Sequence, residues 1–249
     1  MTTGSGETLG TASRGGPLVE IVGVRKDYGG TAPMRLRSLA VQASDRLVLL
    51  GPDAATAETL MHLITGAAVP DEGDVRVAGR DTRTITTDTQ WLESLDRFGI
   101  VTHRAVLIEK LSVASNLALP ITLAIEPMSE DTRRQVEGLA DAVRLARPRL
   151  DAPASDLSMA DRARLHLARA LALTPQLLLL EHPTEGIDDA AARVAFGETL
   201  KAVSQARNVG FIAFSRHEDF ARASGGRRLQ WTPDTGELRE SGFWKRLLG

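Results

Sequence analysis

The segment 49–60, LLGPDAATAETL, has the order of a phosphate-binding loop, because an apolar strand meets a turn and then a helix. In the motif GxxxxGK[ST], backbone N–H groups and the helix N-terminus face an anion, and glycines let the chain wrap closely around it. The lysine reaches the phosphates and the last hydroxyl binds Mg²⁺. Here Gly51 is kept, whereas Ala57 stands at the lysine position and Glu58 at the metal position.

The loss of a lysine and the gain of a glutamate both oppose phosphate binding. At about 4 Å and an effective dielectric constant of about 20, one unit-charge interaction amounts to about 4 kcal/mol before desolvation. If each of the two changes costs a quarter of that energy, the total loss of roughly 2 kcal/mol weakens phosphate binding about thirty-fold. Thr59 keeps a hydroxyl, one residue beyond the metal position. The alternative is that 56–66 is a packed helix with an acidic first turn, which suits the helix dipole.

The segment 157–188, LSMADRARLHLARALALTPQLLLLEHPTEGID, carries a more specific pattern. It resembles the signature helix, Walker B strand and D-loop of the ATP-binding cassette of ABC transporters in unbroken register. The framework residues that match are Arg164, Ala168, Arg169, Ala170, Leu171, Pro175, Pro183, Thr184 and Asp188. The resemblance covers roughly residues 18–240. The segment 111–120 is similar to the lipoprotein-release and macrolide-efflux type of cassette.

The resemblance implies a set of nucleotide-contacting positions. Tyr28, the only tyrosine, falls where the family stacks an aromatic ring on adenine, and His103 replaces the Q-loop glutamine. Ser158 is the serine of LSMAD, where the family has LSGGQ, so it could touch a phosphate or act only as a helix N-cap. The complete set of candidate nucleotide contacts is Tyr28, Gly51, Pro52, Asp53, Ala54, Ala55, Thr56, Ala57, Glu58, Thr59, His103, Ser158 and Asp188.

The residues that would carry hydrolysis are also replaced. The family's Walker B Asp-Glu pair aligns with Glu181, a candidate metal ligand on a longer arm, and His182, a candidate base near neutral pH. The alternative is a polar pair that caps an apolar strand. The switch histidine aligns with Arg216, and a slip of one residue would restore it as His217. The histidines lack the short spacing of a zinc motif, so a zinc site is not expected.

Alternating strands and helices predict an α/β fold with a buried, mostly parallel sheet. The resemblance adds a P-loop NTPase-like core, an antiparallel β subdomain and an inserted helical subdomain at about 82–158. Residues 1–16 are expected to be a disordered tail, and 17–249 the cassette domain. Strands are expected at 18–24, 34–43, 46–50, 74–78, 98–102, 177–180 and 210–214, with a hairpin at 228–238. Helices are expected at 56–66, 112–125 with a break at Pro120, 129–145, 158–173 and 188–206, with a short one after 214.

Composition limits the partners. The chain of 249 residues has a formal net charge of −2, so no basic field points to nucleic acid. It has no cysteine and no apolar run near the roughly 20 residues of a membrane span. We therefore expect that the protein lies at the cytoplasmic face of the inner (plasma) membrane only through its binding to a transmembrane permease. The resemblance also implies a head-to-tail homodimer, or a heterodimer with another cassette subunit.

These replacements predict a degenerate cassette subunit with lost or impaired ATP hydrolysis and a structural or regulatory role. ATP and Mg²⁺ belong to the family, but we expect their binding to be weak or absent here. One alternative is a divergent ATPase that still binds ATP through Tyr28, backbone amides and Mg²⁺ on Glu181. Another is a soluble adaptor with no transporter.

Overall fold

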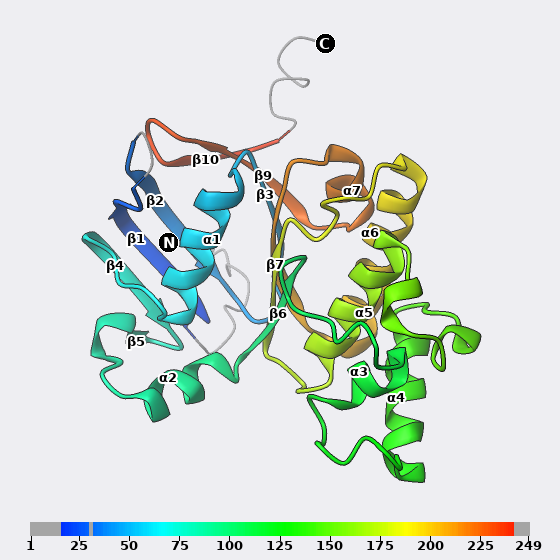
Figure 1. Ribbon diagram of the computed structural model, residues 1–249. Helices are drawn as coiled ribbons and strands as arrows, with labels where there is room; N and C mark the ends of the chain where they lie inside the picture. Colours follow the sequence, from blue (N-terminus) through cyan, green and yellow to red (C-terminus); the bar gives the residue numbers. More distant parts are fainter. Residues whose placement is uncertain (1–15, 30–31, 242–249) are drawn as a thin grey trace, which may run out of the picture.

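The computed structural model describes residues 16–29 and 32–241, which form two sheets with helices packed around them (Figure 1). The expected tail, apart from Gly16, lies outside these residues. The six-stranded sheet has the order β10-β9-β3-β8-β7-β6, and all its neighbours are parallel except β9 and β10. Its strands are β3 (Arg46–Leu50), β6 (Phe98–Thr102), β7 (Leu177–Glu181), β8 (Gly210–Ser215), β9 (Arg227–Thr232) and β10 (Glu237–Glu240). The predicted α/β fold is therefore confirmed.

The second sheet is antiparallel, with four strands in the order β2-β1-β4-β5. Its strands are β1 (Val19–Lys26), β2 (Met34–Val41), β4 (Glu72–Val77) and β5 (Arg80–Asp81). The strand expected at 74–78 begins two residues earlier, because Glu72 pairs with Arg25 of β1 beyond an irregularity at Gly73, whose backbone at φ 78° is one that few other residues adopt.

Seven α-helices occur in the described part of the chain. They are α1 (Ala54–Thr65), α2 (Asp88–Leu95), α3 (Val113–Ala118), α4 (Glu130–Ala142), α5 (Met159–Leu171), α6 (Ala190–Arg207) and α7 (Glu218–Ala223). Short 3-10 turns lie at Thr82–Thr84, Arg147–Arg149 and Ala154–Asp156. Helix α1 lies between the two sheets, and α5, α6 and α7 cover the opposite face of the six-stranded sheet (Figure 1).

The central parallel strands β3, β7 and β8 are apolar except at their ends, because both of their faces are buried. In β3, Leu47 and Leu49 join the core shared with α1 and the antiparallel sheet. Val48 and Leu50 point the other way, into the core built with α3 to α7. The same alternation runs through β7 and β8, so one sheet separates two hydrophobic cores.

Serine side chains fix where three of the helices begin. Ser112, Ser129 and Ser158 each accept a hydrogen bond from the backbone amide three residues further on, at 3.0, 3.2 and 3.1 Å. Each bond satisfies one of the free N–H groups of a first helical turn. The helices expected to start at 129 and 158 thus begin with these two serines as caps, and the helix expected at 56–66 ends at Thr65, where Gly66 caps it at φ 74°.

Some helix boundaries differ from the prediction. The helix expected at 112–125 ends at Ala118, shortly before Pro120, which cannot continue it. The helix expected from 188 begins at Ala190, because Asp189 caps it. Helix α2 was not predicted, since none of its residues is buried and it therefore shows no apolar stripe.

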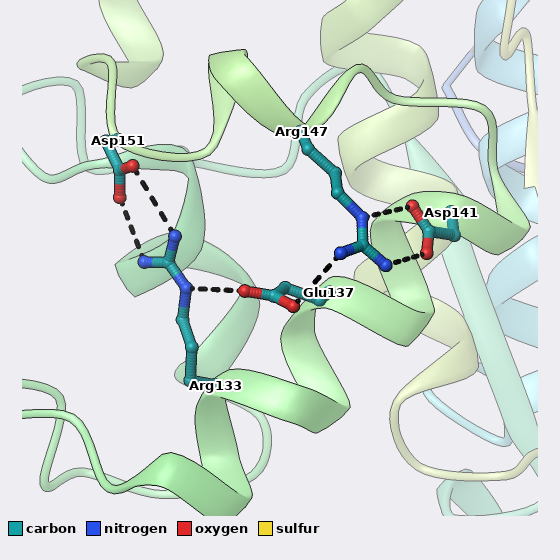
Figure 2. A network of polar contacts seen from close by, with 5 residues as sticks. All are labelled: Arg133, Glu137, Asp141, Arg147 and Asp151. Atoms are coloured by element: carbon teal, nitrogen blue, oxygen red, sulfur yellow. Dashed lines mark hydrogen bonds and ion pairs between the residues drawn. The ribbon is translucent and has the colours of Figure 1, made fainter.

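The segment 82–158 contains α2, α3 and α4, and also β6, which pairs with β7 inside the six-stranded sheet. After β6 the chain leaves the sheet. Ion pairs then tie α4 to the loop leading toward α5 (Figure 2). Arg133 lies 3.1 Å from Glu137 and 2.9 Å from Asp151, and Arg147 lies 3.4 Å from Glu137 and 2.6 Å from Asp141. How the chain divides into subdomains stays a prediction.

Two glycine substitutions are expected to have opposite effects on stability. A Cβ at Gly210 would lie 2.5 Å from the Ala43 carbonyl oxygen and 2.9 Å from the Asp45 nitrogen, and backbone atoms cannot give way cheaply. Gly210→Ala should lower the free energy of unfolding by about 3 kcal/mol. Gly138, exposed on α4 with open space around it, is the control. Gly138→Ala should raise stability by about 0.5–1 kcal/mol. Urea unfolding measures both, and equal effects would contradict this packing.

Candidate functional site

The carboxyl ends of the parallel strands β3, β6, β7 and β8 meet at one edge of the sheet. The residues that follow or end these strands are therefore brought together, although they are far apart in the sequence. Gly51 follows β3, Glu181 ends β7, and Arg216 follows β8. This edge is the candidate site.

Helix α1 begins inside the segment expected to form the phosphate loop. Its first residue is Ala54, and the Asp53 carboxylate accepts a hydrogen bond from the Thr56 amide at 2.8 Å. The Ala57 amide donates to the Asp53 carbonyl at 2.9 Å, as in an ordinary helix. The Thr56 amide holds the pKa of the Asp53 carboxyl below its usual value, so this side chain is ionised at neutral pH. The helix end that would attract an anion thus already carries one.

The next residues of α1 have other partners than a nucleotide. Ala57 is completely buried, and the Thr59 hydroxyl donates to the Ala55 carbonyl at 2.8 Å. Glu58 lies outside the first turn, which holds no acidic residue. The acidic first turn considered for a packed helix is therefore wrong, because the negative charge at the start of α1 comes from the cap, Asp53.

Arg104 connects two of the predicted site residues, although it was not itself predicted. One terminal nitrogen lies 2.8 Å from a Glu58 oxygen, and the other lies 2.6 and 2.8 Å from the two Glu181 oxygens. Thr102 pairs with Glu181 across β6 and β7, so a residue two positions later is well placed to reach that carboxylate. The register of parallel strands was the signal that could have identified Arg104.

A cavity of about 440 Å³ brings Tyr28, Gly51, Asp53 and Thr56 together. The Tyr28 hydroxyl lies 3.4 Å from the Thr56 hydroxyl. Gly51, at φ 109°, is required here, because a Cβ would lie 2.8 Å from the Gln230 side chain and 3.1 Å from the Trp231 carbonyl. The predicted adenine contact and the start of α1 therefore share one cavity.

The candidate base, His182, is enclosed. It has a left-handed backbone at φ 41°, only 3% of it is exposed, and its Nε2 atom has no hydrogen-bond partner among the described residues. Its backbone N–H donates to the Phe214 carbonyl at 3.0 Å. A strained, buried residue is common at functional sites, but this ring does not face open solvent.

Arg216 and His217 have separate partners. Arg216 lies 2.7 and 2.9 Å from the Glu185 oxygens and holds the pKa of that carboxyl below its usual value. His217 Nδ1 lies 2.9 Å from the Thr184 hydroxyl. Burial lowers the pKa of His217, so its ring is neutral at neutral pH. A neutral ring could accept a proton, whereas Arg216 could not.

The remaining predicted contacts lie elsewhere. His103 lines a second cavity, of about 370 Å³, with Met159 and Glu185, and this cavity shares no lining residue with the Tyr28 cavity. Ser158 caps α5, and exposed Asp188 accepts from Arg193 through its carbonyl at 2.9 Å. The structure therefore does not unite His103, Ser158 and Asp188 with the Tyr28 cavity.

The donor set does not fit Mg²⁺ or a nucleoside triphosphate as the phosphate-loop motif would bind them. Within 16–29 and 32–241, no group of three or more His, Cys, Asp or Glu side chains is arranged to hold a metal ion. Both Glu181 oxygens face Arg104, and the Thr59 hydroxyl is bonded to its own helix. No lysine stands at position 57. We therefore derive no catalytic step through either group.

Comparison with known proteins gives a family match over residues 35–185, to the family described as "ABC transporter". The chain is 29% identical over 231 residues to the methionine import ATP-binding protein MetN of Brucella abortus, covering 92% of this chain and 61% of that protein. It is 32% identical over 172 residues to the spermidine/putrescine import ATP-binding protein PotA of Pseudomonas aeruginosa, covering 69% and 45% respectively. The chain thus spans less than two thirds of these curated relatives.

Among solved structures, the fold resembles the dimeric, post-hydrolysis ATP-binding cassette MJ0796 bound to ADP and Pi, with a TM-score of 0.72 and 22% identity over 90% of this chain and all of that one. Both curated relatives are named for import. The likeness to the lipoprotein-release and macrolide-efflux type is therefore not supported. None of the helices that the structure describes is long and apolar enough to cross a bilayer.

A buried histidine predicts how stability changes with pH. Burial on α5 lowers the pKa of His166 from 6.5 to about 4. Between these values the unfolded chain binds a proton that the folded chain does not, so stability falls as the pH falls through this window. His166→Leu should remove up to about 3 kcal/mol of that loss. Urea unfolding between pH 7 and pH 4 measures it, and an unchanged slope in the variant would contradict the assignment.

Proposed function

Because this chain belongs to the ABC transporter family, we propose that it is a cassette subunit of a transporter whose own nucleotide site has lost, or almost lost, ATP hydrolysis. The observation that carries the proposal is the start of α1. There the Asp53 carboxylate bonds to the Thr56 amide at 2.8 Å, at the helix end where the family binds phosphate. A phosphate would have to displace an ionised side chain and would meet its repulsion.

The other positions support the same proposal. Ala57 lacks the charge of a lysine, and its position is fully buried. Glu58 and Glu181 are both engaged in ion pairs with Arg104. His182, at the position of the catalytic carboxylate, is enclosed and carries no such charge. Each change lowers the electrostatic stabilisation that phosphoryl transfer depends on.

The intact scaffold supports a role for the folded subunit. The buried strands, the serine caps and the helices around the site are those of a cassette, while the changes fall on the chemical positions. The chain would therefore keep the shape with which cassettes dock, on a transmembrane permease at the cytoplasmic face of the membrane and against a second cassette. In this role it is structural or regulatory.

A second candidate function is a divergent ATPase that drives transport. Two observations favour it: the relatives are named as ATP-binding proteins, and a cavity of about 440 Å³ remains beside Tyr28. A third, a soluble adaptor, has no such support. Purification of the chain together with a membrane protein would exclude the adaptor.

Nucleotide binding separates the first two functions. We expect a fluorescent ATP analogue to show no saturation up to the order of 1 mM, with or without Mg²⁺. Fluorescence anisotropy of the purified chain measures this. Micromolar, Mg²⁺-dependent binding that Tyr28→Ala weakens would establish the ATPase and end the first proposal. Phosphate release from ATP, measured with the chain alone and with its permease, gives the matching test of hydrolysis.

Restoring the motif should show what Asp53 contributes. Ala57→Lys with Glu58→Ser should raise affinity little, since position 57 is buried and the cap remains. Adding Asp53→Gly frees the Thr56 amide and removes a negative charge, so the triple variant should bind the analogue about tenfold tighter than the double variant. Equal affinities for the two variants would show that Asp53 does not oppose the phosphate.

A further inference from the structure

Arg104 lies where three elements converge. It belongs to the connection between β6 and α3, and it contacts Glu58 of α1 and Glu181 of β7. Each terminal guanidinium nitrogen takes one carboxylate, at 2.8 Å for Glu58 and 2.6 Å for the nearer Glu181 oxygen. A forked, planar cation can hold two carboxylates in this way, whereas a lysine ammonium is a single point charge.

We propose that Arg104 is a permanent internal cation, which occupies the carboxylates of Glu58 and Glu181 at this edge of the sheet and closes that pair to divalent metal ions. This inference rests on the proposed function, because a subunit that does not hydrolyse ATP does not need a bound metal ion. Its test, however, uses no nucleotide. Failure of one proposal is therefore distinguishable from failure of the other.

Burial makes this pairing obligatory for Glu181. Its side chain is 3% exposed, and an ionised carboxylate removed from water needs a partner charge. Arg104 is the only ion-pair partner of Glu181 and of Glu58 among the residues that the structure describes. Arg104 itself is 44% exposed, so it reaches inward from the surface to supply the charge. A metal ion could fill the same need only if Arg104 withdrew.

The pairing also holds the connection 103–112, which leads from the sheet to α3. Further along it, Arg169 donates to the Val106 carbonyl at 2.9 Å. The Asn116 side chain accepts from the Ile108 amide at 2.9 Å and donates to the Ile108 carbonyl at 3.0 Å. Arg104 thus holds the start of this connection, and the hydrogen bonds with Arg169 and Asn116 hold its middle. The position of this segment then does not depend on a metal ion or a nucleotide.

Manganese binding to the purified full chain tests the proposal, with electron paramagnetic resonance of free Mn²⁺ as the readout. The wild type should bind no Mn²⁺ at this edge up to millimolar concentration. Arg104→Gln removes the cation and leaves two carboxylates, so its Mn²⁺ affinity should rise at least about tenfold. The double variant Arg104→Gln/Glu181→Gln should lose that gain.

The matched control is Arg83→Gln. Arg83 is 37% exposed and also contacts two carboxylates, at 2.9 Å from Asp74 and 3.5 Å from Asp81, but on the antiparallel sheet. Because Asp74 keeps Arg76 as a partner at 3.9 Å, Arg83→Gln should leave Mn²⁺ binding at the wild-type level. Thermal unfolding adds a second readout. Arg104→Gln should lower Tm by roughly 5 °C, and Mg²⁺ should restore part of that loss in this variant alone.

Two results would overturn the proposal. One is Mn²⁺ binding by the wild type that Glu181→Gln abolishes, and this test holds even if Arg104→Gln does not fold. The other is a folded Arg104→Gln variant that binds no more Mn²⁺ than the Arg83→Gln control.

Discussion

The parallel strands β3, β7 and β8 are buried on both faces, and most of the structure depends on this. Because their side chains serve two cores, polar groups can appear only where the strands end. The carboxyl ends of these strands lie at one edge of the sheet, so the ionisable groups that follow them are close to one another. At this edge each charge must find its partner within the protein.

The pairs at the edge follow from that constraint. Glu181, which is enclosed at the end of β7, forms an ion pair with Arg104. Glu185, which lies beyond the strand, forms an ion pair with Arg216. At the start of α1 the free backbone amides take the carboxylate of Asp53. Each of these charges is therefore paired within the chain itself.

Sequence patterns predicted the strands and most helices, because hydrophobic periodicity and capping residues act locally. Ser129 and Gly66 are examples, since each bonds within a few residues of its own position. Helix α2 was missed because it buries nothing. The site was harder to predict.

The sequence singled out Glu58 and Glu181 as site residues, but Arg104, which contacts both, lies 46 and 77 positions away from them, and its role depends on strand register. Asp53 was expected only as a loop residue, since its capping bond depends on where α1 begins.

The ion pairs along α4 have a mechanical consequence. Arg133 and Arg147 link one helix to the loop that follows it through exposed carboxylates, and salt screens such pairs strongly (Figure 2). The pairing of Arg104 with the enclosed Glu181 is screened much less. A higher ionic strength should therefore weaken the ion pairs between α4 and the loop that follows it, while the ion pair at the edge of the sheet is little affected. The stiffness of the two regions is thus set separately, one by the surrounding solution and the other by the fold.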